Sequence, residues 1–469
     1  MNELQKIRNI KKTENGDISY KSTGDKYLDI LFMSEYFQNH LDEVPTVDNN
    51  AHGQLFAMFI RDPRLGLGRR DLGRVLMSDA DVAPQDIVRA GRFDDLLFDP
   101  NMSNVNYLLS ELRKGNELAK KWMPRLTGKD RKLAKAFCKQ FEMSEKDYRA
   151  LIKCESTVEY KLSYAEKQEG TPLDELFNES NVTHPLIDDI NFEHVPSLAM
   201  IKYYNTFSNR EDLKDRFTEY LDGVKKGKKK LNTSVTNVYD IYKNRDTIDA
   251  DLFFDKLEKI KINCIPILDT SGSMWDSNDS IGKAMSIAHY LSKCSTYCNG
   301  QLISFSSKPS LITIKEQDYC IEESFWGGLS NKTSARFGTS NKYSRELNSM
   351  YTGDCSNTDF GKTMELLENL QALPEYLVVL SDMEFDSGSY RRKERLKQLW
   401  EEKGYTTKVI WWNFNSRNKT VPETDEMGNI YLSGYSPLLL KYLEAGFDGK
   451  KFLDKLLDEY KDKLYVDNM

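Results

Sequence analysis

The chain has 469 residues, of which 39% are hydrophobic and 30% are charged. This length predicts two or three domains, and the composition excludes a disordered or fibrous chain. A formal net charge of −7 excludes binding to nucleic acid through bulk charge, so such binding would require local basic patches. The sequence has neither a spanning apolar run nor an apolar leader, so we expect an intracellular, cytoplasmic protein without a membrane partner.

Residues 28–250 are predicted to form an all-helical repeat domain that follows an N-terminal extension, residues 1–27. Apolar residues recur there at three- and four-residue spacing, which is typical of amphipathic helices. No repeat of fixed length is evident, so we expect irregular, HEAT-like helix pairs that form either an arc or a ring. The predicted helical segments are 53–62, 69–79, 105–126, 130–141, 145–164 and 197–227.

Residues 257–469 are predicted to form an α/β domain, because apolar strand-like segments alternate there with helical ones. This alternation indicates a doubly wound, mostly parallel sheet of the Rossmann-like class, with helices on both faces. In this class, ligands bind beyond the carboxyl ends of the strands. The predicted strands lie within 262–269, 300–314, 375–382 and 407–415, and the predicted helices within 280–295, 358–373, 391–404 and 436–446.

Two of these predicted strands end in an aspartate, Asp269 and Asp382. Ser271 and Ser273 follow the first strand, and Thr358 precedes a helix, so the sequence predicts five oxygen ligands on one rim of the sheet. Such a set of oxygens fits a hard divalent cation, in the first place Mg²⁺, with Mn²⁺ and Ca²⁺ as alternatives. The alternative for "DTSGSM" is an ordinary polar turn and helix N-cap.

These five residues resemble the metal-ion-dependent adhesion site of a von Willebrand factor A domain. The family pattern is Asp-x-Ser-x-Ser after one strand, a later Thr, and an Asp after a further strand. The sequence departs from it at Met383, where Gly is usual. The resemblance implies a cation with one coordination position left for water or for an acidic group of a partner. Nearby acids are either supporting residues of this site or solvated caps: Asp276, Asp359, Glu384 and Asp386.

Basic residues gather in three segments of the predicted helical domain, 61–74, 120–132 and 225–230, with Trp122 within the second. Arginine and lysine bind phosphate oxygens, and aromatic side chains stack on bases of single-stranded RNA. The alternative is that these side chains are solvated or paired with nearby acids, among them Asp62, Asp71, Asp94 and Asp95. The predicted RNA contacts are Arg64, Arg69, Arg70, Lys121, Lys228 and Lys229.

Motifs along nearly the whole chain resemble a viral and plant family that is similar in architecture to the Ro autoantigens. They include "RDPRLGLGRRDLGR", "LAKKWMPR", "LDTSGSM", "SNTDFGKTMELL" and "YLSGYSPLLLKYLE". In Ro proteins, a ring of helical repeats carries a von Willebrand factor A domain and binds small or misfolded RNAs. The resemblance therefore implies a ribonucleoprotein that binds small or structured RNA.

Three functions compete. The leading hypothesis is a non-enzymatic, Ro-like RNA-binding protein with a cation-binding A-type domain. The alternative is a metal-dependent protein-interaction module or scaffold, in which the cation binds an acidic residue of a protein partner. Metal-dependent phosphoryl transfer or nuclease activity is a third reading, but no nucleophile elbow is present and His289 is predicted to be a core residue.

Overall fold

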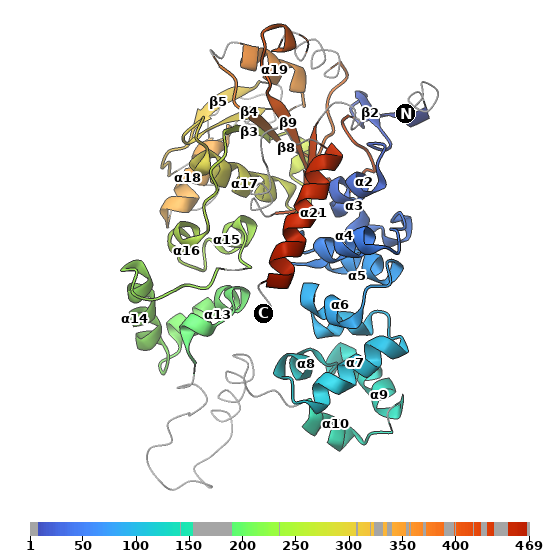
Figure 1. The fold of residues 1–469 in the computed structure, drawn as a ribbon. Helices are drawn as coiled ribbons and strands as arrows, with labels where there is room; N and C mark the ends of the chain where they lie inside the picture. Colours follow the sequence, from blue (N-terminus) through green and yellow to red (C-terminus); the bar gives the residue numbers. More distant parts are fainter. Residues whose placement is uncertain are drawn as a thin grey trace. The chain divides into compact units, whose positions relative to one another are not determined.

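The structure is a computed structural model of the chain (Figure 1). The residues that it describes are 8–140, 142–152, 190–233, 235–305, 308–318, 320–322, 332–334, 340–352, 356, 358–368, 372–388, 398, 400–415, 417–423, 429–435 and 449–466. Within this part of the chain, no helix is both long and apolar enough to cross a membrane.

Contacts between residues divide the chain into two compact units. The first unit contains Met1–Val47, Phe59–Gly73 and Thr236–Met469, and the second contains Asp48–Met58 and Arg74–Val235. This division follows from contacts between residues and does not test the domain boundaries expected from the sequence. Those boundaries stay predictions.

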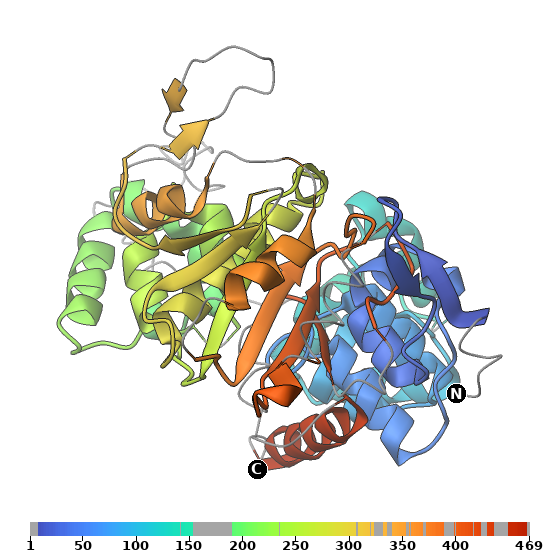
Figure 2. The same cartoon turned by 90° about the horizontal axis from the view of Figure 1, so that it is seen from above.

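The first unit contains a six-stranded sheet. In spatial order, the strands are β10 (Ile430–Ser433), β9 (Lys408–Asn413), β8 (Tyr376–Ser381), β3 (Cys264–Asp269), β4 (Gln301–Phe305) and β5 (Ser310–Thr313). Neighbouring strands are parallel, except that β5 is antiparallel to β4 at one edge. The expectation of a mostly parallel sheet among many helices is therefore confirmed (Figures 1 and 2).

The central strands are apolar because they are covered. All residues of β3 and β8 are buried, including Cys264, Ile265 and Leu377. Helix α17 (Ser280–Cys294) packs against β3, β4 and β8, and α19 (Phe360–Glu368) packs against β4. At the other edge, α2 (Lys26–Phe32) and α21 (Gly449–Val466) pack against β10. Such continuous apolar runs are typical of parallel strands.

Several shorter elements complete the first unit. An antiparallel hairpin of β1 (Ile10–Lys12) and β2 (Ile18–Tyr20) lies near the chain start, and α3 (Ser34–Asn39) follows α2. The remaining elements are α15 (Val238–Asn244), α16 (Ala250–Lys256), α18 (Lys342–Met350) and a second antiparallel pair, β6 (Cys320–Glu322) and β7 (Lys332–Ser334).

The described part of the second unit is helical. Its helices are α6 (Pro84–Ala90), α7 (Met102–Arg113), α8 (Glu117–Trp122), α9 (Arg131–Gln140), α10 (Glu145–Leu151), α13 (Ser197–Asn209) and α14 (Lys214–Lys225). Helices α4 (Ala51–Arg61) and α5 (Arg70–Asp79) are each divided between the two units. The helical character expected of this stretch is confirmed, whereas a HEAT-like arrangement stays a prediction.

Two predicted helices are broken in the structure. In segment 105–126, the first helix, α7, ends at Arg113, just before Gly115. Gly115 has φ +81°, a backbone conformation that favours glycine. Asn116 then caps α8 by accepting from the backbone of Leu118 and Ala119. Segment 197–227 is likewise two helices, α13 and α14. The predicted helix over 436–446, residues 153–164 and most of 391–404 lie outside the described residues.

Candidate metal centre

The carboxyl ends of β3 and β8 lie side by side. The two strands are parallel neighbours, and Leu268 pairs with Leu380 in their register. Asp269 is the last residue of β3, and Asp382 directly follows β8. The rim predicted from the sequence therefore brings both carboxylates to one place.

Asp269 is fully buried at this rim. One carboxylate oxygen, Oδ1, accepts a hydrogen bond from the backbone N–H of Ser271 at 2.9 Å. The other, Oδ2, accepts from the hydroxyl of Ser381 at 2.5 Å. Burial and the nearby charge of Asp382 raise the pKa of Asp269 to about 7, because both disfavour a second negative charge there.

Asp382 is also buried, with 2% of its surface exposed. Its Oδ1 accepts from the backbone N–H of Glu384 at 3.3 Å, and its Oδ2 lies 3.5 Å from the guanidinium of Arg417. Burial raises the pKa of Asp382, although contacts from Ser273, Glu384 and Arg417 oppose this shift. The site thus concentrates two acidic groups where water is excluded.

Two oxygen atoms at the rim lack a hydrogen-bond partner within the described part of the chain: Oδ2 of Asp382 and Oγ1 of Thr358. Thr358 is 1% exposed and lies two residues before the start of α19, and its backbone carbonyl accepts from the N–H of Asp386 at 2.9 Å. Buried polar atoms are normally hydrogen-bonded, so unsatisfied ones require an explanation such as an ion or water. A hydroxyl and a carboxylate oxygen are both ligands that hard cations prefer.

The serines of "DTSGSM" lie on the turn that follows β3. Their hydroxyl oxygens, in Ser271 and Ser273, are 3.2 Å apart. Ser271 precedes a short 3-10 turn (Gly272–Met274) without a capping bond from its side chain, and α17 begins only at Ser280. Neither serine is therefore the N-cap of α17, whereas the alternative of an ordinary polar turn stays open, because the side chain of Asp269 accepts from the backbone N–H of Ser271. With the two aspartates and Thr358, they form an oxygen-rich set that fits a divalent cation in its chemistry.

The four acids predicted around the site have structural partners. Asp276 accepts from the backbone and hydroxyl of Ser280, each at 3.0 Å, at the start of α17. Asp359 accepts from the backbone of Lys362 at 3.2 Å at the start of α19. The backbone N–H of Asp386 binds Thr358, as described above. These contacts fit caps and loop supports.

Glu384 holds three segments together beneath the rim. It is 1% exposed, and its carboxylate accepts from the backbone N–H of Glu14 at 2.6 Å. The side-chain amides of Asn415 and Asn418 donate to it at 3.1 and 2.8 Å. Burial raises the pKa of Glu384, which these hydrogen bonds oppose. Glu384 therefore fixes the N-terminal hairpin and the loop after β9 next to Asp382.

Met383 adopts φ +66°, in the left-handed region that favours glycine. This is the position at which the sequence departs from the family pattern. The backbone therefore keeps the conformation that a glycine would adopt, and the side chain of Met383 is buried at 2% exposure. The local backbone at Met383 is left-handed, a conformation in which glycine is favoured.

Sequence reasoning missed Ser381 and Arg417. Ser381 precedes the predicted ligand Asp382, and the sequence alone indicated only an ordinary strand residue there. Arg417 lies in the loop after β9, and Ser381 pairs with Asn413 at the end of that strand. The general signal that could have found both is their position at the carboxyl ends of parallel strands.

The predicted RNA contacts of the first unit differ in exposure. Arg69 is 4% exposed, forms an ion pair with Glu35, and donates to the hydroxyl of Tyr435 at 2.7 Å. Arg70 is exposed at the start of α5. Arg64 is exposed and lies 3.7 Å from the carboxylate of Asp62. Of these three, Arg69 is a buried structural residue.

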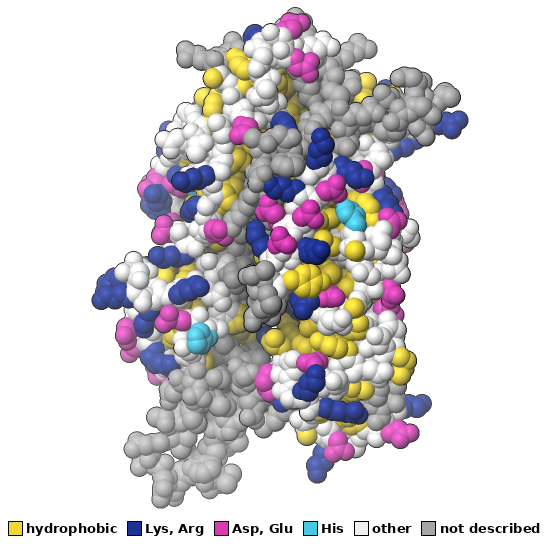
Figure 3. Space-filling model, viewed as in Figure 1, with side chains coloured by type: hydrophobic (Ala, Val, Ile, Leu, Met, Phe, Trp, Pro, Cys, Tyr) yellow, Lys and Arg dark blue, Asp and Glu magenta, His cyan; other side chains and the backbone are white. Residues whose placement is uncertain are grey.

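The predicted RNA contacts of the second unit are Lys121, Lys228 and Lys229. The ammonium of Lys121 lies 5.2 Å from the ring centre of Trp122. Lys228 is exposed, and Lys229 lines a cavity of about 280 Å³ together with Phe192 and Arg216. On the face shown in Figure 3, basic side chains lie among acidic ones rather than in one broad basic area.

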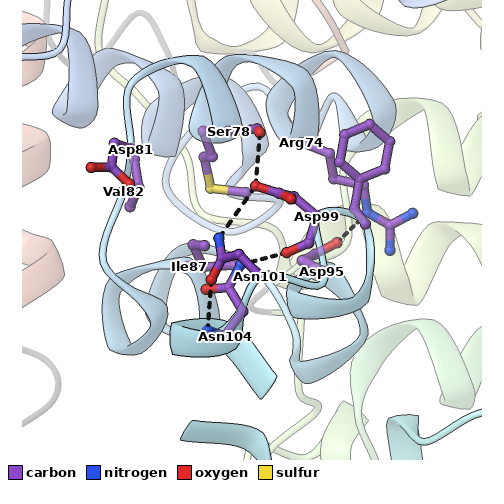
Figure 4. Close-up of a pocket in the computed structure, with 11 residues that line it drawn as sticks. Arg74, Ser78, Asp81, Val82, Ile87, Asp95, Asp99, Asn101 and Asn104 are labelled. Atoms are coloured by element: carbon purple, nitrogen blue, oxygen red, sulfur yellow. Dashed lines mark hydrogen bonds and ion pairs between the residues drawn. The ribbon is translucent and has the colours of Figure 1, made fainter. Parts of the chain in front are cut away.

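The alternative of local pairing is confirmed for Arg74. Its guanidinium binds Asp94 at 3.1 Å and Asp95 at 2.5 Å. Figure 4 shows the adjacent pocket, in which Ser78 and Asn101 donate to Asp99. The pocket has a volume of about 20 Å³, room for about one water molecule. Its polar side chains are thus largely satisfied by one another.

Comparisons with known proteins cover most of the chain. Residues 102–258 match a domain of unknown function (DUF2828), and residues 263–463 match another (DUF7788). An uncharacterized protein of Acanthamoeba polyphaga mimivirus is 24% identical, over 93% of this chain and 84% of the relative. The crystal structure of the Deinococcus radiodurans Ro (RSR) protein aligns with a TM-score of 0.35 and 12% identity, over 92% of this chain and 86% of that one. The chain is therefore similar to a viral protein and to two domains that have no assigned function.

Proposed function

We propose that this chain is a non-enzymatic binding protein whose sheet unit holds a divalent cation and presents it to an acidic group of a partner. One observation carries the proposal. Two buried carboxylates, Asp269 and Asp382, meet at the carboxyl edge of the sheet. The buried hydroxyl of Thr358, whose backbone binds Asp386 in the loop after β8, has no hydrogen-bond partner among the described residues. A buried pair of acids is unfavourable alone, and a cation would remove the cost.

The ligands in this proposal are Asp269, Ser271, Ser273, Thr358 and Asp382. Carboxylates and hydroxyls favour Mg²⁺, with Mn²⁺ and Ca²⁺ as alternatives. The resemblance to the von Willebrand factor A family supports the same set, including an open coordination position. A bound cation would supply a positive charge for a carboxylate of a protein partner.

We infer a binding role rather than a catalytic one because two candidate bases of the sheet unit, His289 and Asp276, have structural partners. His289 is fully buried in α17, and its Nε2 lies 2.6 Å from the carboxylate of Glu346. Burial lowers the pKa of His289, which Glu346 opposes. Asp276, three residues after Ser273, accepts from the backbone N–H and the hydroxyl of Ser280 at the start of α17. Metal-dependent phosphoryl transfer is the competing reading and would appear as turnover of a phosphodiester.

The experiment is retention of the full chain on an immobilised glutamate-rich peptide, with Mg²⁺ or with EDTA. The proposal predicts retention in Mg²⁺ that is lost in EDTA and in Asp382→Asn. The exposed Asp255→Asn, in the same unit, is the control and should behave like wild type. Retention that is equal with Mg²⁺ and EDTA would contradict the proposal.

We propose RNA binding by residues 28–250, the predicted helical domain, as a second function. The supporting observation is that Arg70 and Lys228 are exposed, and that Lys121 lies beside the half-buried ring of Trp122. Cations next to an aromatic ring can bind a backbone phosphate and a base together. The resemblance of the motifs to the Ro group supports this function.

Filter binding of a hairpin RNA across a salt series tests this second function. Arg70→Ala and Lys228→Ala should each weaken binding and reduce the salt slope by about 1, the change expected for one lost phosphate contact. The exposed Lys461→Ala on α21 is the control and should leave the slope unchanged. Binding without any salt dependence would contradict RNA recognition through these cations.

A further inference from the structure

We propose that Arg417 is an exchangeable counterion of the metal centre, which neutralises Asp382 in the cation-free protein and moves away when a divalent cation binds. The inference rests on the proposed cation site. Arg417 lies outside the Asp-x-Ser-x-Ser, Thr and Asp pattern. Its displacement would exchange one positive charge at the site for another.

The position of Arg417 carries the inference. Its guanidinium lies 3.5 Å from Oδ2 of Asp382, the same buried oxygen that lacks a hydrogen-bond partner among the described residues. This distance permits charge neutralisation without a short hydrogen bond. A divalent cation bound to Oδ2 would therefore meet a like charge from Arg417 at close range, and the two positive groups would compete for one oxygen.

The two partners of this contact differ in mobility. Asp382 is buried at 3% side-chain exposure, whereas the side chain of Arg417 is 45% exposed. A half-exposed arginine side chain can rotate into the solvent at little cost in free energy, because water replaces its contacts. The buried carboxylate has no such alternative. Exchange therefore moves Arg417 and leaves the ligand in place.

The backbone beneath Arg417 is held by its neighbours. The side-chain oxygen of Asn415 accepts from the backbone N–H of Arg417 at 2.6 Å and from that of Asn418 at 3.0 Å. Both asparagines donate to Glu384, two residues after Asp382. The loop therefore fixes where the arginine side chain begins, while the side chain itself is 45% exposed and can rotate.

The test is calorimetric titration of the full chain with Mn²⁺, comparing wild type with Arg417→Gln and Arg417→Ala. The matched control is Lys419→Gln, which removes one positive charge from the same segment; Lys419 pairs with Glu43 at 3.8 Å. We expect Mn²⁺ to bind the two Arg417 variants about fivefold more tightly than wild type, the factor for loss of a partly exposed ion pair. Lys419→Gln should change affinity less than twofold, since it contributes only a screened charge.

The possible results separate the two proposals. Tighter Mn²⁺ binding in the Arg417 variants, with little change in Lys419→Gln, supports the exchange. Equal or weaker binding in both Arg417 variants, while wild type binds Mn²⁺ and Asp382→Asn does not, overturns the exchange and leaves the cation site standing. An equal gain in Lys419→Gln also overturns it, because a general charge effect then explains the result. Absence of binding in wild type and in both Arg417 variants overturns the cation site and the exchange together.

Discussion

Ser381 donates its hydroxyl to Asp269 across 2.5 Å and thereby joins the carboxyl ends of β8 and β3. The same oxygen of Ser381 accepts from the backbone N–H of Met383 at 2.9 Å, which helps to hold the left-handed turn after Asp382. One hydroxyl thus positions both acidic ends of the rim. It orients Asp269 directly and Asp382 through the backbone.

Ser381→Ala should destabilise the protein and weaken cation binding. Loss of a buried hydroxyl leaves Asp269 and the N–H of Met383 without this partner, at a cost of about 1–3 kcal/mol. Urea unfolding at pH 7.5 with EDTA measures the cost. Ser286→Ala is the matched control because Ser286 is equally buried and, among the described residues, its hydroxyl donates to the carbonyl of Lys283 within its own helix, at 2.8 Å. Equal effects of the two substitutions would contradict the positioning role of Ser381.

Asp269→Asn should stabilise the cation-free protein and abolish stabilisation by Mg²⁺. The amide removes a buried charge next to Asp382, and its oxygen can still accept from Ser271. The gain in the free energy of unfolding at pH 7.5 should be on the order of a few kcal/mol, given the raised pKa of Asp269. Thermal unfolding with EDTA and with Mg²⁺ measures both effects. A lower melting temperature than wild type in EDTA would contradict this account.

The contribution of Asp269 to the stability of the cation-free protein should fall as pH rises from about 4 to about 7. The pKa of Asp269 is raised in the folded state, from 3.8 to about 7, so in this window the folded protein binds more protons than the unfolded chain. The stabilising effect of the protonated group is fully present below the lower value and lost above the upper one. Urea unfolding of wild type and Asp269→Asn at several pH values isolates the contribution of Asp269. An unchanged difference between them across the window would contradict the raised pKa.

Arg69→Ala and Arg70→Ala should differ in their effects on stability and RNA binding, although the two residues are neighbours in sequence. The buried Arg69 pairs with Glu35 and donates to Tyr435, so its removal should cost about 3 kcal/mol, the lower end of the range for a broken buried pair, because Lys283 still neutralises Glu35 at 2.8 Å. Arg70 is exposed, and its removal should change stability by less than about 0.5 kcal/mol while weakening RNA binding. Urea unfolding and filter binding together measure this contrast. Equal stability losses would contradict the structural role of Arg69.

The sequence predicts the parallel sheet and the rim well because their signals are local. The apolar strands that end at Asp269 and Ser381 are contiguous, and polar residues follow each directly. The burial of Arg69 could not be predicted in this way. Its partners, Glu35 and Tyr435, are distant in sequence, and "GLGRRDLGR" alone does not distinguish a buried arginine from an exposed one. Arg417 escaped prediction for the same reason.

The N-terminal extension shows a further limit of local reasoning. Residues before 28 carry no helical pattern, yet the structure has a hairpin there, and Thr13 donates its hydroxyl to the carbonyl of Phe385 at 2.8 Å. The backbone N–H of Glu14 donates to the carboxylate of Glu384, in the same loop as Phe385. These contacts join the start of the chain to the loop after β8. Short strands of this kind depend on tertiary partners rather than on their own propensity.

The most direct test of the central claim is an electron paramagnetic resonance titration of the full chain with Mn²⁺, which counts bound and free cation. The account predicts one site in wild type and in Asp255→Asn, and loss of that site in Asp382→Asn and in Asp269→Asn, with weaker binding in Thr358→Ala. Wild-type protein that binds no Mn²⁺, or aspartate variants that bind it as wild type does, would contradict the metal centre.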